Sequence, residues 1–317
     1  AQLEGFDTMV SLSENAPVAV FEGDEYLSSP IDRRPKFHRY HPHIALISGI
    51  AWDHINVFPT FKEYIDQFRI FAEMTDPEGI LIYCDCDETL VKMIHTGNIK
   101  ACKIPYSTHP AVTRDGVTFL QTVTGDVPIR VFGDHNLQNI SGAKIVCNEA
   151  GIGDEKFYEA ISTFKGASKR LQLLSSNKHT SIFLDFAHSP SKLKATTTAV
   201  KKQYPDRRLV ACMELHTFSS LNEHFLEHYN GSMASADTAF IYFNPETIRH
   251  KKLKEITPQQ VHKAFGEGNI EVFTDKDALT GRLLSTDWQG KNLLLMSSGN
   301  FSGIDFQEFA GKIIGEK

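Results

Sequence analysis

The chain has 317 residues, of which 41% are hydrophobic and 23% charged, and its formal net charge is -6. This size allows about two domains with cores of their own. The acidic balance, without a block rich in Lys and Arg, disfavours nucleic acid, and no apolar run approaches the roughly 20 residues of a membrane-spanning helix. Because a basic leader followed by an apolar core is also not recognisable, we expect a cytoplasmic protein without nucleic-acid or membrane partners.

The five cysteines are scattered and odd in number, which disfavours a disulfide framework and suits a reducing compartment. Cys84 and Cys86 flank a single residue, but a second pair at metal-ligand spacing does not accompany them. We therefore expect buried, reduced thiols in a strand rather than structural zinc. The histidines of "KFHRYHPH", which are His38, His41 and His43, are expected to be solvated.

The first part of the chain has short β-rich runs that end in Gly or acidic residues, at 17–23, 43–51 and 78–87. These runs predict buried strands. Between the second and third, residues 61–74 carry apolar side chains at helical spacing. The order strand, helix, strand predicts an α/β domain.

Between residues 100 and 131 the pattern changes to short alternating pieces with a Thr-Gly-Asp turn, which predicts a small antiparallel β appendage. Residues 133–151 then carry helix start and stop signals. A basic, glycine-containing segment, "FKGASKRLQLLSSNKH", follows, and we place a domain boundary near residue 171 within it. Gly166 and the Ser175-Ser176 pair are expected to give this segment local freedom.

The last part of the chain alternates regularly between strands and helices, which predicts a doubly wound parallel sheet. The expected strands are 180–187, 207–213, 238–243, 270–274 and 291–299, and the expected helices are 190–203, 220–229, 257–266, 276–285 and 305–314. Thr257, Pro258 and Gln260 match the start signal of one of these helices.

Ligands of such sheets bind beyond the carboxyl ends of the strands, so the residues that follow each strand are the functional candidates. Taken singly, each has a simpler explanation as a helix cap or turn residue. Several of these positions are polar or charged: Glu22, Asp24, Glu25, Asp53, His54, Asp134 to Asn136, Asp185, His188, Glu214, His216, Thr217 and Ser297 to Asn300.

In this order, the motifs "FEGDEY", "IAWDH", "GDHNLQN", "FKGASKRLQ" and "LDFAHSPSKL" resemble those of the Mur ligase family. These ATP-dependent enzymes join amino acids or peptides to the carboxylate of a UDP-muramyl precursor. The resemblance covers essentially the whole chain. It implies a central ATP-binding domain over 1–170, with a mixed sheet, helices and a small β appendage, and a Rossmann-like domain over 171–317.

One family element has no counterpart here, because a phosphate-binding loop of the G-x-x-G-K-[ST] type does not occur in the chain. The family also has a UDP-binding domain before this loop. The resemblance therefore implies the C-terminal two-thirds of a longer enzyme, which is expected to be inactive by itself. The alternative is a protein that naturally lacks these parts.

The resemblance also implies the cofactors ATP and Mg²⁺ and assigns residues to them. Asp24, Glu25 and Asp53 either support the metal or cap helices. The assigned roles are Glu22 and His54 as Mg²⁺ ligands, His135, Asn136 and Asn139 for adenine, Arg170 for phosphate, and Asp185 and His188 for the ribose side of the nucleotide.

Hydrogen-bonding residues of the last domain are expected to bind the incoming amine: His216, Thr217, Ser219, Ser298 and Asn300. The expected partners are UDP-N-acetylmuramate and a murein tripeptide, because Tyr26 and the long segment after it look most like the tripeptide-adding members. The alternatives are L-alanine as the amine, a related enzyme such as a folylpolyglutamate synthase, or a nucleotide-binding module without catalytic activity.

Overall fold

The computed structural model describes residue 8 and residues 10–52, 57–266 and 268–315. The chain divides into two compact units, an N-terminal unit from Phe6 to Phe164 and a C-terminal unit from Lys165 to Lys317. The division falls within the basic segment, a few residues before position 171. Each unit is described by itself below.

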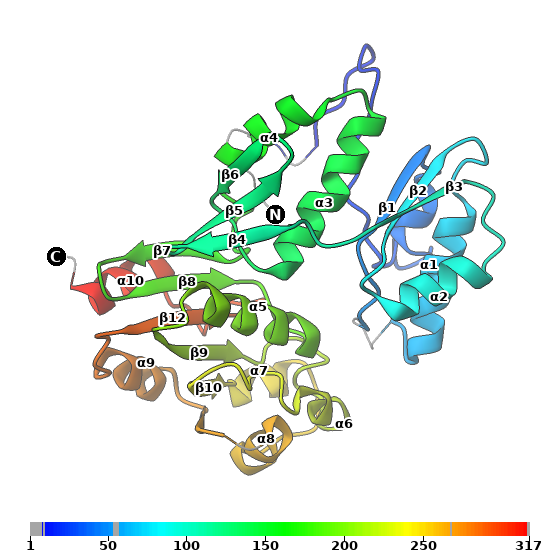
Figure 1. Ribbon diagram of the computed structural model, residues 1–317. Helices are drawn as coiled ribbons and strands as arrows, with labels where there is room; N and C mark the ends of the chain where they lie inside the picture. Colours follow the sequence, from blue (N-terminus) through cyan, green and yellow to red (C-terminus); the bar gives the residue numbers. More distant parts are fainter. Residues whose placement is uncertain (1–7, 9, 53–56, 267, 316–317) are drawn as a thin grey trace. The chain divides into compact units, whose positions relative to one another are not determined.

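The N-terminal unit contains a parallel sheet of three strands, β1 (Ile44–Ile47), β2 (Ile80–Cys84) and β3 (Cys102–Tyr106), in this order. Helices α1 (Phe61–Glu73) and α2 (Glu88–Thr96) pack near it (Figure 1). Helix α1 begins at Thr60, whose hydroxyl accepts from the Glu63 amide in a capping box. The core of this sheet includes residues with no exposed surface: Ala72, Leu81, Ile82, Leu90 and Ile94.

A second, antiparallel sheet contains β4 (Ala111–Arg114), β5 (Val117–Thr122) and β6 (Gly125–Ile129). Helix α3 (Asp134–Glu149) contacts β1 and β2, while α4 (Asp154–Thr163) contacts β6. The predicted appendage is therefore present but shorter than expected. Strand β3 was wrongly included in it, because its backbone continues the parallel ladder from β2.

The predicted strand at 17–23 is wrong, because the structure has irregular backbone there. Val18 and Val20 are 56% and 89% exposed, and the Phe21 ring stacks on Tyr40 at 5.0 Å. A strand needs a neighbour that satisfies its backbone groups. Among the described residues, β1 pairs only with β2, and the 17–23 segment joins no sheet. An apolar run followed by acidic residues was not sufficient to identify a strand.

The expectation that His38 is solvated is also wrong. Its side chain lies in the one-turn helix η1 (Lys36–Arg39), is 6% exposed and donates from Nε2 to the Gln67 carbonyl at 2.8 Å. Burial lowers the pKa of His38 below its ordinary value. The short helix turns Phe37 and His38 toward α1. The prediction assumed an extended surface segment, in which this burial would not occur.

The C-terminal unit contains one six-stranded sheet in the order β11-β10-β9-β12-β8-β7. Its strands are β7 (Gln172–Ser176), β8 (Ser181–Asp185), β9 (Arg208–Glu214), β10 (Thr238–Tyr242), β11 (Ile270–Phe273) and β12 (Lys291–Met296). All pairs are parallel except β7 with β8.

Strand β7 corrects the expectation of a purely parallel sheet. A turn in which the Asn177 amide donates to the Thr180 carbonyl folds β7 back on β8. Ser175 and Ser176, which were expected to give the basic segment freedom, pair with Ile182 and Ser181 in the ladder.

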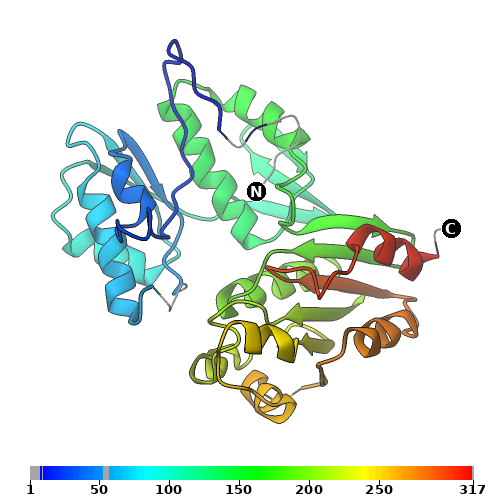
Figure 2. The same cartoon turned by 180° about the vertical axis from the view of Figure 1, so that it is seen from behind.

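Helices cover both faces of this sheet, as expected for a doubly wound fold. Helices α9 and α10 share a buried core with one face, and α5 contacts β9 and β12, as Figures 1 and 2 show from opposite sides. The predicted capping box of Thr257 and Gln260, with Pro258 at the first helical position, is confirmed. The helical bounds are α5 Pro190–Gln203, α6 Glu223–Leu226, η2 Glu227–Tyr229, α7 Pro245–His250, α8 Pro258–Phe265, α9 Lys276–Leu284 and α10 Phe306–Ile314.

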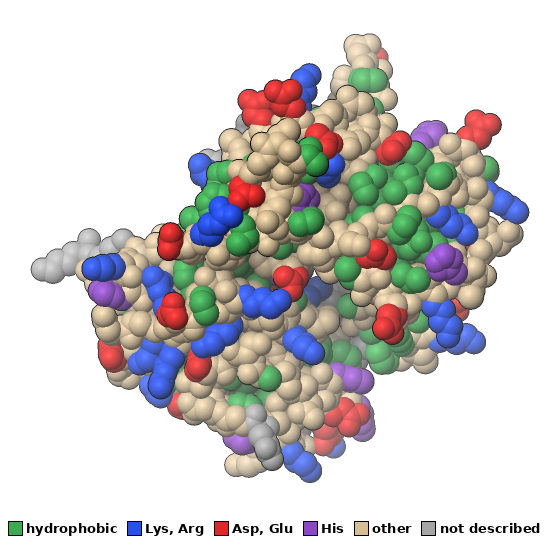
Figure 3. All heavy atoms as spheres, viewed as in Figure 1, with side chains coloured by type: hydrophobic (Ala, Val, Ile, Leu, Met, Phe, Trp, Pro, Cys, Tyr) green, Lys and Arg blue, Asp and Glu red, His purple; other side chains and the backbone are tan. Residues whose placement is uncertain are grey.

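The surface drawn in Figure 3 carries acidic and basic side chains interspersed with one another. Within the described ranges, every helix is too short or too polar to cross a bilayer. Neither observation assigns a partner.

Gly142 in α3 offers a test of the packing in the N-terminal unit. A Cβ there would lie 2.9 Å from Tyr106 Cζ and 3.0 Å from Leu46 Cδ1. Such overpacking costs about 1–3 kcal/mol, and the roughly 1 kcal/mol that Ala gains over Gly inside a helix offsets only part of it. We expect Gly142→Ala to lower the free energy of unfolding in urea. Gly281→Ala in α9 is the matched control, because a Cβ there meets nothing within 4 Å. Equal stabilisation by both changes would contradict the packing described here.

Candidate functional site

The carboxyl ends of β8, β12 and β9 lie level with one another in the C-terminal sheet. Met296 pairs with Asp185 on one side and with Met213 on the other. From β8 the chain continues to α5, and from β12 it continues to α10. These two helices cover opposite faces of the sheet. Open α/β sheets bind ligands beyond the carboxyl ends of strands at a divergence of this kind.

Asp185, at the end of β8, fastens the basic segment to the sheet. Its carboxylate is 6% exposed and accepts from the Leu171 and Ala187 amides, each at 2.6 Å. The Phe186 amide donates to the Lys169 carbonyl at 2.7 Å, and the Arg170 guanidinium lies 5.2 Å from the Phe186 ring centroid.

His188 completes this group. Its Nδ1 lies 2.8 Å from the Phe186 carbonyl, and its ring meets the Phe186 ring edge to face. The predicted nucleotide residues Arg170, Asp185 and His188 are therefore brought together around the loop after β8. Asp185 has in addition a structural role that the sequence did not reveal.

A second polar group lies at the ends of β9 and β12. The Glu214 carboxylate is buried and accepts from the Ser297 hydroxyl and, at 2.9 Å, from the Phe301 amide. His216 Nδ1 lies 3.8 Å from the same carboxylate. Gly299 fits closely above it, because a Cβ there would lie 2.8 Å from Glu214 Oε2. Glu214 and Ser297 were not among the assigned site residues. Both had been named among the polar positions after strands, and the signal for Glu214 was a lone acidic residue after the apolar run 209–213.

The residues expected to bind the amine differ in their surroundings. The Ser298 hydroxyl is buried and has no hydrogen-bond partner among the described residues, so a ligand could satisfy it. The Asn300 side chain accepts from the Gly303 amide at 3.0 Å, and Thr217 donates to Ser220 at 3.0 Å, which are local turn contacts. Ser219 is 7% exposed. His216, Ser298 and Asn300 thus share the edge formed by β9 and β12.

The adenine residues assigned from the sequence lie in the first turns of α3. Gly133 precedes the helix with a φ of 92°, which favours glycine. Asn136 Nδ2 donates to the Phe132 carbonyl at 2.8 Å. His135 and Asn139 are four residues apart, so they lie on the same side of the helix. This group belongs to the N-terminal unit.

Of the two assigned magnesium ligands, Glu22 lies in the part of the chain that the structure describes. Glu22 is exposed and makes no hydrogen bond or ion pair within the part of the chain that the structure describes. Asp24 pairs with Lys36 at 2.6 Å, and Glu25 accepts from the Tyr64 hydroxyl at 3.2 Å, so both hold this segment in place. Asp53 and His54 lie outside the described residues.

Comparison with known families adds to this geometry. The sequence profile of the Mur ligase middle domain matches residues 5–147, and that of the Mur ligase glutamate ligase domain matches residues 169–299. The chain belongs to the Mur ligase family. It carries the middle and C-terminal domains, in the order in which the two units occur.

Individual Mur ligases resemble this chain over most of its length. A UDP-N-acetylmuramate–L-alanine ligase of Desulfitobacterium hafniense is 27% identical, with 75% of this chain and 57% of the relative covered. A UDP-N-acetylmuramate–L-alanyl-γ-D-glutamyl-meso-2,6-diaminoheptanedioate ligase of Haemophilus influenzae is 24% identical, with 92% and 64% covered. The chain therefore spans about three-fifths of the length of these relatives.

The fold is also shared with solved Mur ligase structures. The UDP-N-acetylmuramate-alanine ligase of Thermotoga maritima superposes with a TM-score of 0.60 at 13% identity, covering 88% of this chain and 60% of that protein. At this identity the likeness concerns the fold alone. It confirms the predicted α/β architecture.

Proposed function

We propose that this Mur ligase chain belongs to an ATP-dependent ligase that forms an amide bond at the lactyl carboxylate of UDP-N-acetylmuramate. The observation that carries the proposal is the match of both units to consecutive Mur ligase domains. In the proposed reaction, ATP converts the carboxylate to an acyl phosphate, and an amine attacks the acyl carbon with release of phosphate.

Each unit, taken by itself, offers groups suited to a nucleotide: the C-terminal unit around β8 and the N-terminal unit at the start of α3. His135, Asn136 and Asn139 offer ring and amide groups for adenine, because an amide can both donate and accept. Arg170 offers a permanently charged fork for phosphate. Asp185 offers a carboxylate for ribose hydroxyls, with His188 on the same loop.

Magnesium is proposed to be bound by Glu22 and His54. A carboxylate and an imidazole fit a cation that takes few protein ligands and keeps phosphate oxygens and water for the remainder. When bound, Mg²⁺ would neutralise charge that develops on the phosphoryl oxygens.

The edge formed by β9 and β12 is proposed to bind the incoming amine. His216, Ser298 and Asn300 supply polar groups there, and the buried Ser298 hydroxyl lacks a partner among the described residues. Thr217 and Ser219 lie on the loop after β9 and support its shape.

The amine is proposed to be a murein tripeptide that ends in a diamino acid. This choice rests on Tyr26 and the segment that follows it. In the structure this segment forms a closed loop, in which the Ser28 amide donates to the Arg34 carbonyl at 2.8 Å and the Lys36 amide to the Tyr26 carbonyl at 2.9 Å. The alternative amine is L-alanine, which the names of several relatives specify.

A competition experiment tests both the proposed ligase reaction and the proposed choice of amine. The full-length gene product, rather than this chain by itself, receives UDP-N-acetylmuramate, ATP, Mg²⁺ and equimolar L-alanine and tripeptide, and the products and released phosphate are measured. We expect tripeptide to be joined with the higher kcat/KM. A higher kcat/KM for L-alanine overturns the amine assignment alone. Nucleotide binding without phosphate release, whichever amine is present, overturns the ligase and favours a nucleotide-binding module.

A further inference from the structure

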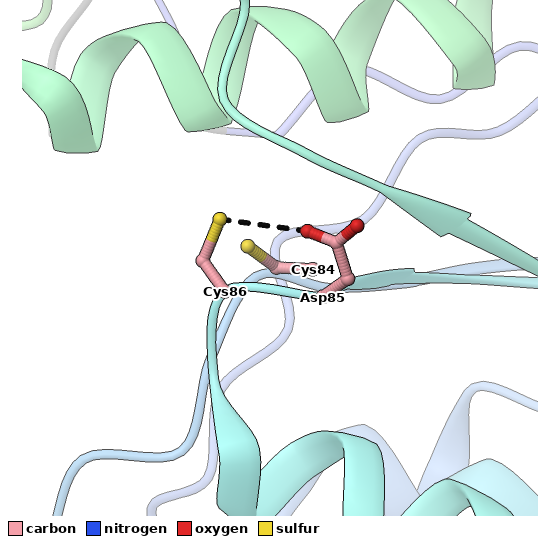
Figure 4. A group of neighbouring side chains, drawn as sticks. All are labelled: Cys84, Asp85 and Cys86. Atoms are coloured by element: carbon pink, nitrogen blue, oxygen red, sulfur yellow. Dashed lines mark hydrogen bonds between the residues drawn. The ribbon is translucent and has the colours of Figure 1, made fainter.

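The carboxyl edge of the parallel sheet in the N-terminal unit carries two thiols that the proposed ligase does not use. Cys84 ends β2 and is buried, as expected, but Cys86 is exposed because the strand has already ended. Asp85 lies between them, and Figure 4 shows the three side chains gathered at this strand end. Burial raises the pKa of the Cys84 thiol to about 11, so by itself this side chain is a neutral thiol at physiological pH.

The three side chains have the spacing of metal ligands. One ligand atom from each of Cys84, Asp85 and Cys86 lies within 4.8 Å of the other two. Cys86 Sγ is 3.5 Å from Asp85 Oδ1. With Zn–S of about 2.3 Å and Zn–O of about 2.0 Å, a sulfur and an oxygen on a tetrahedral zinc lie about 3.5 Å apart.

Neighbouring residues of β3 and the loop after it support these ligands. The Ser107 hydroxyl donates to Asp85 Oδ2 at 2.6 Å and so orients the carboxylate, whose Oδ1 accepts from the Cys86 thiol. Tyr106 pairs with Cys84 across the two strands. Its side chain is 4% exposed, and its hydroxyl has no hydrogen-bond partner among the described residues. The Tyr106 hydroxyl interacts with the Cys84 side chain, so a thiolate at Cys84 would give this buried donor a strong acceptor.

We propose that Cys84, Asp85 and Cys86 form a binding site for a thiophilic divalent cation of the Zn²⁺ class. On binding, each thiol loses a proton to the solvent and forms a sulfur–metal bond, and water completes the tetrahedron. Thiolates select such cations over Mg²⁺, which prefers oxygen ligands, so this site is distinct from a nucleotide-bound magnesium.

The position of the site suggests what an occupying cation would do. The next residue, Asp87, accepts from the Ile50 amide at 2.6 Å and from the Leu90 amide at 3.0 Å. Asp87 thereby joins the loop after β1 to the start of α2. A cation held by the three preceding residues would fix this junction at the carboxyl edge of the sheet.

The test uses Co²⁺ as a spectroscopic substitute for Zn²⁺ on the whole chain, kept reduced with a phosphine. We expect one Co²⁺ per chain, with a thiolate-to-metal charge-transfer band that added Zn²⁺ removes. Cys86→Ser, at an exposed position that should not disturb folding, is expected to abolish the band, and so is Cys84→Ser. The matched control is Cys102→Ser, because Cys102 is exposed at the opposite end of the same sheet and should leave the titration unchanged.

A further variant tests whether Asp85 and the residue that orients it contribute to metal binding, or whether the two thiols alone account for it. Ser107→Ala removes the hydroxyl that orients Asp85, and we expect it to weaken Co²⁺ binding by about 10- to 100-fold while the charge-transfer band keeps its position. The proposal is overturned if the wild-type chain shows no such band, if the band survives in Cys86→Ser, or if it disappears in Cys102→Ser. These outcomes do not depend on ligase activity, so they leave the proposed function untouched.

Discussion

Replacing Asp185 with alanine is expected to lower the free energy of unfolding of the C-terminal unit by about 2–5 kcal/mol. The change removes a buried carboxylate and leaves the Leu171 and Ala187 amides without their acceptor, at a cost of about 1–3 kcal/mol for each buried group. Leu171 and Lys169 also have φ values of 47° and 57°, a region that non-glycine residues rarely adopt. Asp185 holds the backbone in this conformation, so its removal should release the segment from the sheet.

Urea unfolding followed by the fluorescence of Trp288 measures this effect, because Trp288 is buried in the C-terminal unit. A Trp52→Phe background removes the other tryptophan. Asp305→Ala is the control, since Asp305 only caps α10 and its loss should cost about 1 kcal/mol. Asp185→Asn keeps one acceptor oxygen and should fall between the two. If Asp185→Ala were no more damaging than Asp305→Ala, the structural role of this carboxylate would be refuted.

Most of the fold could be predicted from the sequence where one periodic pattern extended over a whole element. The regular alternation after residue 180 predicted β8 to β12 because fully buried parallel strands are continuous apolar runs. Strand β7 was missed since its residues, Gln172 to Ser176, are half polar and gain their structure from pairing with β8. The prediction of a strand at 17–23 was wrong for the opposite reason. Its apolar residues suggest a strand, but strand formation depends on a neighbour that local sequence does not reveal.

The candidate site could be predicted only in part, for a related reason. Position after a strand identified Asp185, His188 and His216 as neighbours at one sheet edge, because parallel strands end together. What each carboxylate bonds to depends on contacts between residues far apart in sequence. Glu214 accepts from Phe301, which is 87 residues away. The local sequence around either residue does not predict this bond.

Replacing Glu214 with alanine is the second change with a large expected effect. Its carboxylate accepts from the Ser297 hydroxyl and the Phe301 amide, and removing it leaves both of these buried donors without their acceptor. Phe301 has no exposed surface and a φ of 50°, and Ser302 has a φ of 58°. This carboxylate is thus one of the groups that hold the loop after β12 in an uncommon conformation, together with Asn300 and Tyr242. We expect a loss of about 2–5 kcal/mol in the free energy of unfolding.

Two measurements distinguish an effect of Glu214 on the conformation of the loop after β12 from a general loss of stability. Hydrogen exchange of the Phe301 amide should accelerate under conditions in which the strand amides of β9 and β12 remain protected. If the β9–β12 edge binds the amine as proposed, KM for the amine should rise at least about ten-fold while kcat changes little, since the lost contacts lie away from the reacting atoms. Glu271→Ala is the matched control, because that carboxylate pairs with Arg282 at 2.9 Å on the surface and should contribute at most about 1 kcal/mol. Unchanged exchange at Phe301 in Glu214→Ala would show that the loop keeps its conformation without the carboxylate.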